Sequence, residues 1–216
     1  MTRSSDFPID IGLFELESEL RRTGALHIAG IDEVGRGALA GPLTVCAIVL
    51  EPESHIDGLN DSKLLRPAKR MEISHELRSV CSSYAIVHIS AAEIDSTGLA
   101  RALKRAARSA LSELSCECDH VLTDGHPLGI HKFERGIISG DRRVAAIAAA
   151  SVIAKVARDS IMDGAHDLYP EYDFLNNKGY GTKNHLRAIA THGLTPLHRR
   201  SFGPCSGQLK ILDRCQ

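Results

Sequence analysis

Two adjacent carboxylates, Asp32 and Glu33, end an apolar run in the segment HIAGIDEVGRGALAGP. Two further aspartates lie at similar boundaries, since Asp124 ends another apolar run and Asp141 precedes a long one. A buried carboxylate is costly unless it is compensated, and several together repel one another, so a cation must hold them. Oxygen ligands without a nearby His or Cys cluster favour Mg²⁺ or Mn²⁺ over Zn²⁺. Two such ions about 4 Å apart are the usual apparatus of phosphodiester hydrolysis.

Ordinary structural roles compete with this interpretation. Asp141 has the position of a cap on the helix that follows, and Asp124-Gly125 has the composition of a turn. Neighbours on a regular strand also face opposite sides of a sheet. Asp32 and Glu33 therefore reach one site only where the strand ends or bends, and Val34-Gly35 is the expected end.

Glycines follow the acidic pair at Gly35, Gly37 and Gly41. The spacing resembles a dinucleotide-binding fingerprint, but that fingerprint opens a helix, whereas Pro42 and a β-rich run follow here. Glycine also lets main-chain groups approach a substrate closely. A ribose 2′-hydroxyl both donates and accepts hydrogen bonds and separates RNA from DNA, so a glycine-lined main chain is suited to test for it.

Composition indicates one globular domain inside a reducing compartment. The 216 residues are 43% hydrophobic, with 26 Lys and Arg against 27 Asp and Glu. This balance does not by itself indicate nucleic acid, although a local basic patch is enough to bind it. Six cysteines are scattered in a chain too large to need disulfides. No signal peptide is visible, and no apolar run reaches the ~20 residues of a membrane span, so we expect a cytoplasmic protein.

Hydrophobic periodicity predicts strands that come first and then alternate with helices, which is typical of an α/β sheet covered by helices. The helix that follows Asp141 is apolar nearly all round and rich in alanine, so we expect it to be buried close against the sheet. The predicted strands are 28–32, 43–50, 84–90 and 120–123, and the predicted helices are 67–82, 97–114, 144–161 and 183–192.

From about Ile28 to Phe202 the chain resembles the ribonuclease HII (type-2 ribonuclease H) family. Its motifs occur in order as AGIDEVGRG, NDSKLL, LTDG, SGD, AAASVIAKVARD, NKGYGTKNH and GLTPLHRRSF. The resemblance implies an α/β, RNase H-like mixed five-stranded sheet flanked by helices, with a small C-terminal helical extension. It implies an N-terminal helical extension at 1–25, a catalytic core at 26–162 and a helical substrate-binding segment at 163–216, as one compact catalytic domain overall.

The activity implied by the resemblance is that of an endonuclease dependent on two divalent ions, Mg²⁺ or Mn²⁺. It hydrolyses the RNA strand of RNA–DNA hybrids and cuts 5′ to single ribonucleotides embedded in duplex DNA, leaving 3′-hydroxyl and 5′-phosphate ends. Such an enzyme removes misincorporated ribonucleotides and RNA primers. The corresponding metal-binding and catalytic residues are Asp32, Glu33, Asp124 and Asp141, and the substrate-binding residues are Gly35, Arg36, Gly37, Lys63 and Tyr180.

One position departs from the family pattern. The family usually has lysine before the glycine of its KGD motif, where this chain has Ser139. The missing cation is expected to weaken phosphate contacts or to alter substrate preference, while Asp141 keeps its metal-binding role. Asp159 is the alternative fourth carboxylate.

Four weaker features have two interpretations each. Arg101, Lys104, Arg105 and Arg108 form a helical stripe, which we interpret as a solvated face in preference to a phosphate-tracking surface. The segment from Cys116 to His120 lacks the spacing of a zinc site and is expected to be a loop with free thiols. His198 and Arg199 serve either the active site or the fold. Residues 208–212 either resemble a sliding-clamp docking peptide or pack as an amphipathic tail.

Three other functions stay open at this point: a resolvase- or integrase-like DNA nuclease, a non-catalytic nucleic-acid-binding module and, more distantly, a dinucleotide-dependent oxidoreductase. The expected partners are RNA–DNA hybrids and ribonucleotide-containing duplex DNA, with the sliding clamp as a further candidate. No membrane association is expected, and the protein is expected to be a monomer.

Overall fold

The computed structural model describes residues 12–212 except 53, 55, 60–61 and 63–64, and the side chains of residues 208–212 also lie outside the described part. The chain divides into two compact units. Unit 1 consists of Met1–Glu33, Val45–Val87 and Lys104–Val156, and unit 2 consists of Val34–Thr44, His88–Leu103 and Ala157–Gln216. The predicted boundaries after residues 25 and 162 stay a prediction.

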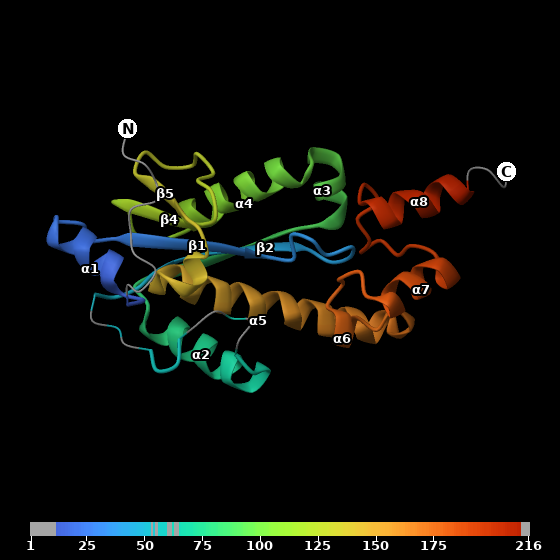
Figure 1. The fold of residues 1–216 in the computed structure, drawn as a ribbon, viewed down its shortest axis with the longest axis horizontal. Coiled ribbons are helices and arrows are strands. Elements are labelled where there is room, and N and C mark those ends of the chain that lie inside the picture. The colour runs from blue at the N-terminus through green and yellow to red at the C-terminus, as the bar shows by residue number, and fades with distance from the viewer. Residues whose placement is uncertain (1–11, 53, 55, 60–61, 63–64, 213–216) are drawn as a thin grey trace. The chain divides into compact units, whose positions relative to one another are not determined.

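A five-stranded sheet, most of which belongs to unit 1, has the strand order β3-β2-β1-β4-β5 (Figure 1). The strands are β1 (Ile28–Val34), β2 (Leu43–Val49), β3 (Ser83–Ile89), β4 (His120–Asp124) and β5 (Glu134–Ile137). β4 is paired in parallel with both β1 and β5. The predicted mixed five-stranded α/β sheet is confirmed. The hydrophobic pattern marked four of the strands but missed β5, because that strand is short and carries charged residues.

Eight α-helices and two short 3₁₀ helices are described in the structure. They are α1 (Glu15–Arg22), α2 (Pro67–Val80), α3 (Ala91–Thr97), α4 (Leu99–Ser112), α5 (Ala145–Leu168), α6 (Phe174–Asn177), α7 (Lys183–His192), α8 (Gly203–Leu212), η1 (Gly140–Arg142) and η2 (Pro170–Tyr172). No helix among these described residues is long and apolar enough to cross a membrane.

Local sequence signals explain the starts of α2 and α7. Pro67 occupies the first turn of α2, and the Thr182 hydroxyl caps α7 by accepting the main-chain N–H of His185. The predicted helix over 97–114 is interrupted at Gly98, which ends α3 with a φ of 81°. The helix predicted to stop at residue 161 runs on to Leu168, because Gly164 is tolerated in a helix at a cost of about 1 kcal/mol.

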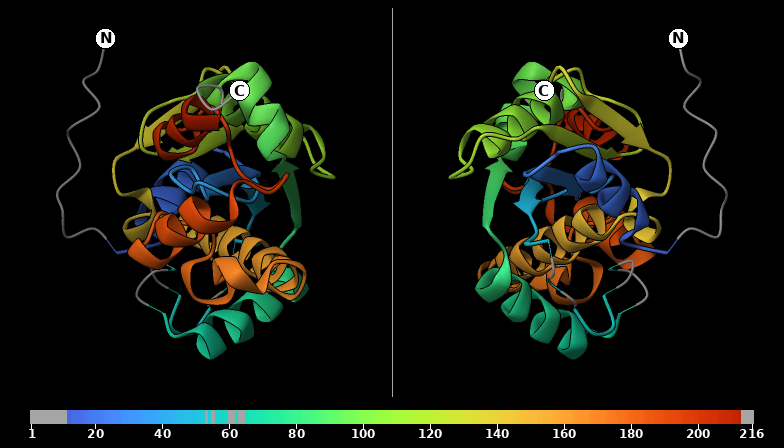
Figure 2. Two further views of the ribbon diagram at one scale, coloured as in Figure 1. Left: turned by 90° about the vertical axis from the view of Figure 1, so that its right-hand side faces the viewer. Right: turned by 90° about the vertical axis from the view of Figure 1, so that its left-hand side faces the viewer.

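Helix α5 approaches β1 closely in unit 1, as its alanines predicted. A Cβ atom on Gly30 would lie 2.2 Å from the carbonyl carbon of Ala146, so only glycine fits in β1 at this point. The sheet separates α2 and the first half of α5 from α4 (Figures 1 and 2). Helix α1 packs through Leu16 and Leu20 into a cluster with residues of β1, β4 and α5.

Unit 2 has an apolar cluster of its own. The rings of Tyr172 and Phe174 stack with centroids 5.5 Å apart, and Leu39 and Met162 belong to the same buried cluster. The cluster therefore packs the chain that follows β1 against the end of α5.

Free thiols are present at Cys46, Cys81, Cys116, Cys118 and Cys205, as expected for the Cys116–His120 segment.

Candidate active site

Two of the predicted carboxylates, Asp32 and Asp124, lie side by side near the ends of adjacent strands in unit 1. The register pairs Ile31 of β1 with Thr123 of β4, and Asp32 and Asp124 are the next residues along these two parallel strands. Neighbouring strands are about 4.8 Å apart. The sheet therefore brings together two carboxylates that are far apart in the sequence.

Asp32 is buried, with only 6% of its surface exposed. Its Oδ1 accepts the main-chain N–H of Glu33 at 2.7 Å, and it also forms a hydrogen bond with the side chain of Ser151. The Ser151 hydroxyl in turn lies 2.8 Å from that of Ser62. Burial raises the pKa of Asp32 well above its usual range, and the charges of Glu33 and Asp124 raise it further. A bound cation would reverse this effect, because opposite charge favours the ionised form.

Asp141, the third predicted aspartate, lies in a tight turn that contacts Asp124. Oδ1 of Asp124 accepts the main-chain N–H of Gly140 at 2.7 Å, and the next residue is Asp141, which is 5% exposed. A Cβ atom on Gly140 would lie 2.6 Å from Cδ1 of Ile147, so the turn packs closely on α5. The expected cap by Asp141 on the long helix is wrong: Asp141 lies inside η1, and α5 begins only at Ala145.

The structure also tests the expected end of β1 and shows the surroundings of Ser139 and Asp159. Strand β1 ends at Val34, and Gly35 follows with a φ of 86°, which confirms the predicted strand end beside Glu33. Ser139, in place of the family lysine, is exposed and adopts a left-handed conformation with a φ of 54°. The alternative carboxylate Asp159 belongs to unit 2, whereas the four predicted ligands all belong to unit 1.

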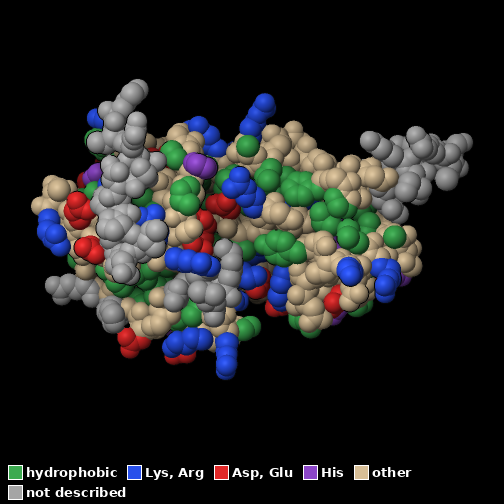
Figure 3. Space-filling model, viewed as in Figure 1, with side chains coloured by type: hydrophobic (Ala, Val, Ile, Leu, Met, Phe, Trp, Pro, Cys, Tyr) green, Lys and Arg blue, Asp and Glu red, His purple; other side chains and the backbone are tan. Residues whose placement is uncertain are grey.

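The carboxylates of unit 1 fit a hard divalent cation by donor type and by charge. Among the described residues, no group of three or more His, Cys, Asp or Glu side chains is already arranged to hold a metal ion. The charges of Glu33 and Asp124 nevertheless help to raise the pKa of Asp32, and a cation bound beside these oxygen ligands would lower that pKa again. On the face in Figure 3, acidic side chains lie together over the sheet and basic side chains border them.

The predicted substrate-binding glycines lie in unit 2, in a stretch that we call the glycine segment (residues 35–42). A Cβ atom on Gly35 would lie 2.1 Å from Nε of Arg158, whereas nothing lies within 4 Å of one on Gly37. The Arg36 carbonyl accepts a hydrogen bond from Nη1 of Arg199 at 3.0 Å. The main-chain N–H of Leu39 donates to the Gly179 carbonyl at 2.8 Å, which ties the glycine segment to the predicted tyrosine motif.

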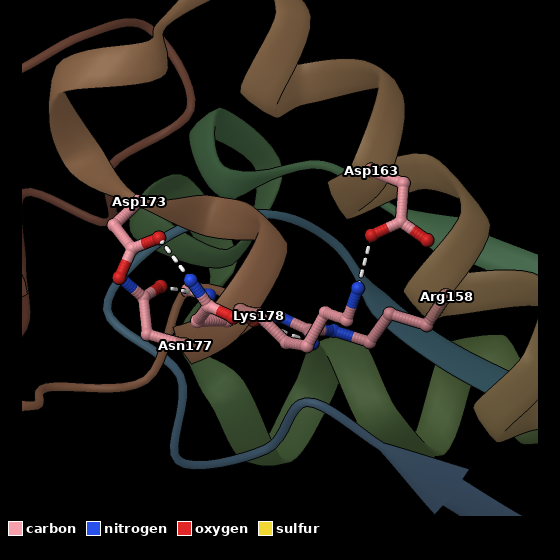
Figure 4. A network of polar contacts seen from close by, with 7 residues as sticks. Arg158, Asp163, Asp173, Asn177 and Lys178 are labelled. Carbon is pink, nitrogen blue, oxygen red and sulfur yellow. Dashed lines mark hydrogen bonds and ion pairs between the residues drawn. The ribbon is translucent and has the colours of Figure 1, made fainter. Parts of the chain in front are cut away.

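That motif forms the tyrosine segment (residues 177–181). The Tyr180 ring is partly exposed, and the guanidinium carbon of Arg158 lies 5.4 Å from its centroid. Arg158 also donates to the main-chain carbonyl of Lys178 at 2.8 Å. The side chain of Lys178 extends to Asp163 on α5, with which it forms an ion pair (Figure 4). The structure thus joins the glycine segment and Tyr180, while Lys63 lies outside the described residues.

Sequence reasoning missed several residues that support these groups. Ser151 was visible as the one polar residue interrupting the apolar run from Val144 to Ala154, and this was the available signal for its contact with Asp32. Arg158 and His185 lie inside the motifs AAASVIAKVARD and NKGYGTKNH, and this was the available signal for them. The four residues of the basic stripe on α4 are exposed, as a solvated face requires, and the binding of phosphate by this stripe stays untested.

Comparison with known proteins decides the family. The sequence profile of ribonuclease HII matches residues 29–205. The chain belongs to the ribonuclease HII family. The ribonuclease HII of Desulfitobacterium hafniense is 44% identical over 201 residues, which cover 93% of this chain and 77% of that protein. The ribonuclease H2 of Pyrococcus horikoshii OT3 has the same fold, with a TM-score of 0.75 at 23% identity over 87% of this chain and 99% of that one.

Membership of the ribonuclease HII family confirms the predicted ribonuclease H activity on RNA–DNA hybrids and on embedded ribonucleotides. It decides against the DNA nuclease, the non-catalytic module and the oxidoreductase. A more distant ribonuclease HIII, Bst-RNase HIII, was solved in complex with Mn²⁺ and has a TM-score of 0.68 at 19% identity, over 97% of this chain and 77% of that one. At this identity the likeness concerns the fold alone.

Proposed function

We propose that this ribonuclease HII hydrolyses the phosphodiester bond 5′ to a ribonucleotide with a site built from Asp32, Glu33, Asp124 and Asp141. The observation that carries this proposal is the buried carboxylate of Asp32, which lies beside the charges of Glu33 and Asp124 at adjacent strand ends. Asp32 would hold both of two divalent ions, Mg²⁺ or Mn²⁺, and the other three carboxylates would complete their ligand sets. When bound, such ions supply Lewis-acid activation of water and of the leaving 3′-oxygen.

The protein's own part in this reaction is to hold the carboxylates in fixed orientations. The N–H of Glu33 and the hydroxyl of Ser151 hold the Asp32 carboxylate, and the N–H of Gly140 holds that of Asp124. These hydrogen bonds fix the ligands before the substrate arrives, which is what precise phosphoryl chemistry requires. The expected products carry 3′-hydroxyl and 5′-phosphate ends.

The glycine segment and Tyr180 are proposed to select the ribonucleotide. Main-chain groups of Gly35, Arg36 and Gly37 would contact the 2′-hydroxyl, and the Tyr180 ring would pack on the sugar that lacks one. Gly37 supports this role because it is exposed and has open space around it. Arg158 beneath the Tyr180 ring supports a fixed ring position. Lys63 is proposed to contact a phosphate.

The test is cleavage of a DNA duplex that carries one ribonucleotide, beside an otherwise identical all-DNA duplex, with Mg²⁺ or Mn²⁺. We expect one metal-dependent cut 5′ to the ribonucleotide, loss of this cut in Asp124→Asn, and full activity in the control Asp167→Asn, which alters an exposed carboxylate of α5. Cutting of both duplexes would contradict selection by the 2′-hydroxyl, and activity of Asp124→Asn would contradict the assigned site.

Sliding-clamp binding is a separate proposal for residues 208–212. It is supported by the likeness of this segment to clamp-docking peptides and by a fold-level relative, the ribonuclease HII of Archaeoglobus fulgidus, which was solved in complex with PCNA (TM-score 0.69, 23% identity, 82% of this chain and 96% of that one). Clamp binding that persists after deletion of residues 208–216 would contradict it. We further propose a cytoplasmic monomer, and the free thiols support a reducing compartment.

A further inference from the structure

Two buried histidines form a hydrogen-bonded pair in unit 2. The Nε2 atoms of His185 and His198 are 3.1 Å apart, and the side chains are 0% and 2% exposed. Nδ1 of His198 accepts the main-chain N–H of Thr195 at 3.0 Å, so the His198 proton is on Nε2 and is donated to His185. His185 then carries its own proton on Nδ1 and donates it to the Tyr180 carbonyl at 2.9 Å.

The surroundings keep this pair neutral. The His198 ring centroid is 5.0 Å from that of Tyr172, and the His185 centroid is 5.4 Å from that of Phe174. Burial among these rings lowers the pKa of both histidines, and proximity to His185 lowers that of His198 further, to about 4. Each neutral histidine can therefore donate one hydrogen bond and accept another. All the hydrogen bonds from Thr195 through His198 and His185 then point from donor to acceptor toward the Tyr180 carbonyl.

The next residue, Arg199, makes equivalent contacts with the glycine segment. Its guanidinium is completely buried and donates from Nη1 to the Arg36 carbonyl at 3.0 Å. Nε and Nη2 donate to the Gly41 carbonyl at 3.2 and 3.0 Å. Every side-chain hydrogen bond that Arg199 makes with the described residues goes to a main-chain carbonyl of this segment. Arginine is suited to this arrangement because its planar donors have fixed directions.

We propose that His198 and Arg199 are positioning residues that couple the glycine segment to Tyr180 and so determine selectivity for a single embedded ribonucleotide. The two side chains leave adjacent points of one backbone stretch, which is itself bridged to the glycine segment between Ala40 and His198. One side chain fixes the carbonyls of the glycine segment, and the other fixes the carbonyl of Tyr180 through His185. This inference rests on the substrate contacts proposed above.

The coupling has a consequence that core packing alone does not have. A duplex with a single ribonucleotide can be cut from only one binding position, so the contacts of the glycine segment and of Tyr180 must be in place together. A long RNA–DNA hybrid can be cut from many binding positions, so one misplaced contact is tolerated. Loss of the coupling therefore lowers activity on the single-ribonucleotide duplex more than on the hybrid, whereas a loss of folded protein lowers both activities equally.

The variants His198→Asn and Arg199→Lys test this. Asparagine can replace the acceptor Nδ1 but does not reach His185, whereas His198→Gln places an amide donor near the Nε2 position and should restore the contact. Lysine keeps the charge of Arg199 but loses its planar set of donors. The matched controls are His192→Asn and Arg187→Lys, because both residues are exposed on α7.

The measured quantity is the ratio of kcat/KM on the single-ribonucleotide duplex to kcat/KM on a long hybrid. We expect this ratio to fall at least tenfold in His198→Asn and Arg199→Lys, and to stay within twofold of wild type in His198→Gln and in both controls. An unchanged ratio in folded His198→Asn and Arg199→Lys would overturn the proposal.

A second measurement needs no variant. The imidazole ¹⁵N chemical shifts of the wild-type protein report the tautomers directly, and we expect His198 protonated on Nε2 and His185 on Nδ1. Any other tautomer would overturn the coupling even if the variants failed to fold. A wild-type enzyme that cuts all-DNA duplex equally well would instead contradict the proposed function, which separates the two failures.

Discussion

Gly35 and Gly37 are two residues apart, yet only Gly35 is required by its own surroundings. Gly35 has a left-handed φ of 86°, and a Cβ atom there would lie 2.1 Å from Nε of Arg158. Gly37 has no atom within 4 Å of such a Cβ atom and is exposed. Packing therefore explains why residue 35 is glycine. It does not explain why residue 37 is glycine, and we attribute that glycine to substrate binding.

Gly37→Ala is expected to fold normally and to lose activity. Alanine at an unstrained exposed position raises stability by roughly 0.4–1 kcal/mol, because it restricts the unfolded chain. The added methyl group would occupy the space through which a sugar approaches, so we expect kcat/KM on a single-ribonucleotide duplex to fall at least tenfold. Urea denaturation and cleavage kinetics measure the two effects.

Gly35→Ala is the matched comparison. It is expected to lower the free energy of unfolding by roughly 2 kcal/mol or more, because it combines backbone strain with a collision against Arg158. Full activity of Gly37→Ala would refute the substrate role of Gly37, and equal destabilisation by the two substitutions would refute the structural distinction between them.

Metal binding should appear in thermal stability as well as in activity. A ligand that binds only the folded protein adds about 2.7 kcal/mol at one hundred times its Kd. We therefore expect Mn²⁺ to raise the Tm of the wild-type protein and of Asp167→Asn, but to have little effect on Asp32→Asn. Without metal, Asp32→Asn should be at least as stable as wild type, because it removes a buried carboxylate beside Glu33 and Asp124. An identical Mn²⁺ shift in Asp32→Asn would show that the ion binds elsewhere.

The proximity of Asp32 to Asp124 was predictable because each follows an apolar run and because adjacent strands of a sheet bring such positions together, whereas the metal-binding role of the four carboxylates stays a prediction. The contacts of Arg158 were not predictable, since its partner carbonyl at Pro42 is 116 residues away and an arginine in a helix is ordinarily exposed. Strand β5 was missed because it is short and charged, and because its contacts leave no hydrophobic pattern in the sequence. Its Glu134 carboxylate accepts the main-chain N–H groups of Leu128 and Ile130, a contact that no periodic pattern encodes.

Glu17 of α1 should make the protein less stable as the pH rises from about 4.5 to about 7. Its carboxylate is 6% exposed, and Oε1 accepts the N–H of Ala146 at 3.0 Å. Burial raises its pKa from the usual 4.5 to about 7. Between these values the unfolded chain releases a proton that the folded protein keeps, so stability falls as pH rises and levels off above pH 7.

The variant Glu17→Gln removes this dependence while keeping an acceptor for Ala146. At pH 8 we expect it to exceed wild type by up to about 3 kcal/mol in the free energy of unfolding, and to differ little at pH 4. Glu19→Gln, on the exposed side of the same helix, should follow wild type at every pH. A wild-type pH profile that Glu17→Gln leaves unchanged would contradict the assignment.

His198 should act in the opposite direction, on the acid side. Burial and the neighbouring His185 lower its pKa from the usual 6.5 to about 4, so its contribution to stability is complete above pH 6.5. As the pH falls from 6.5 to 4, the unfolded chain gains a proton that the folded protein does not take up, and up to about 3 kcal/mol is lost. Urea denaturation from pH 7 to pH 4 should show this loss in the wild-type protein and in the exposed control His192→Asn, and a smaller loss in His198→Gln, which cannot titrate. If wild type and His198→Gln lost stability in parallel, the pKa of the His198 imidazole would be ordinary. Protonation of another group would then be the cause of the instability in acid.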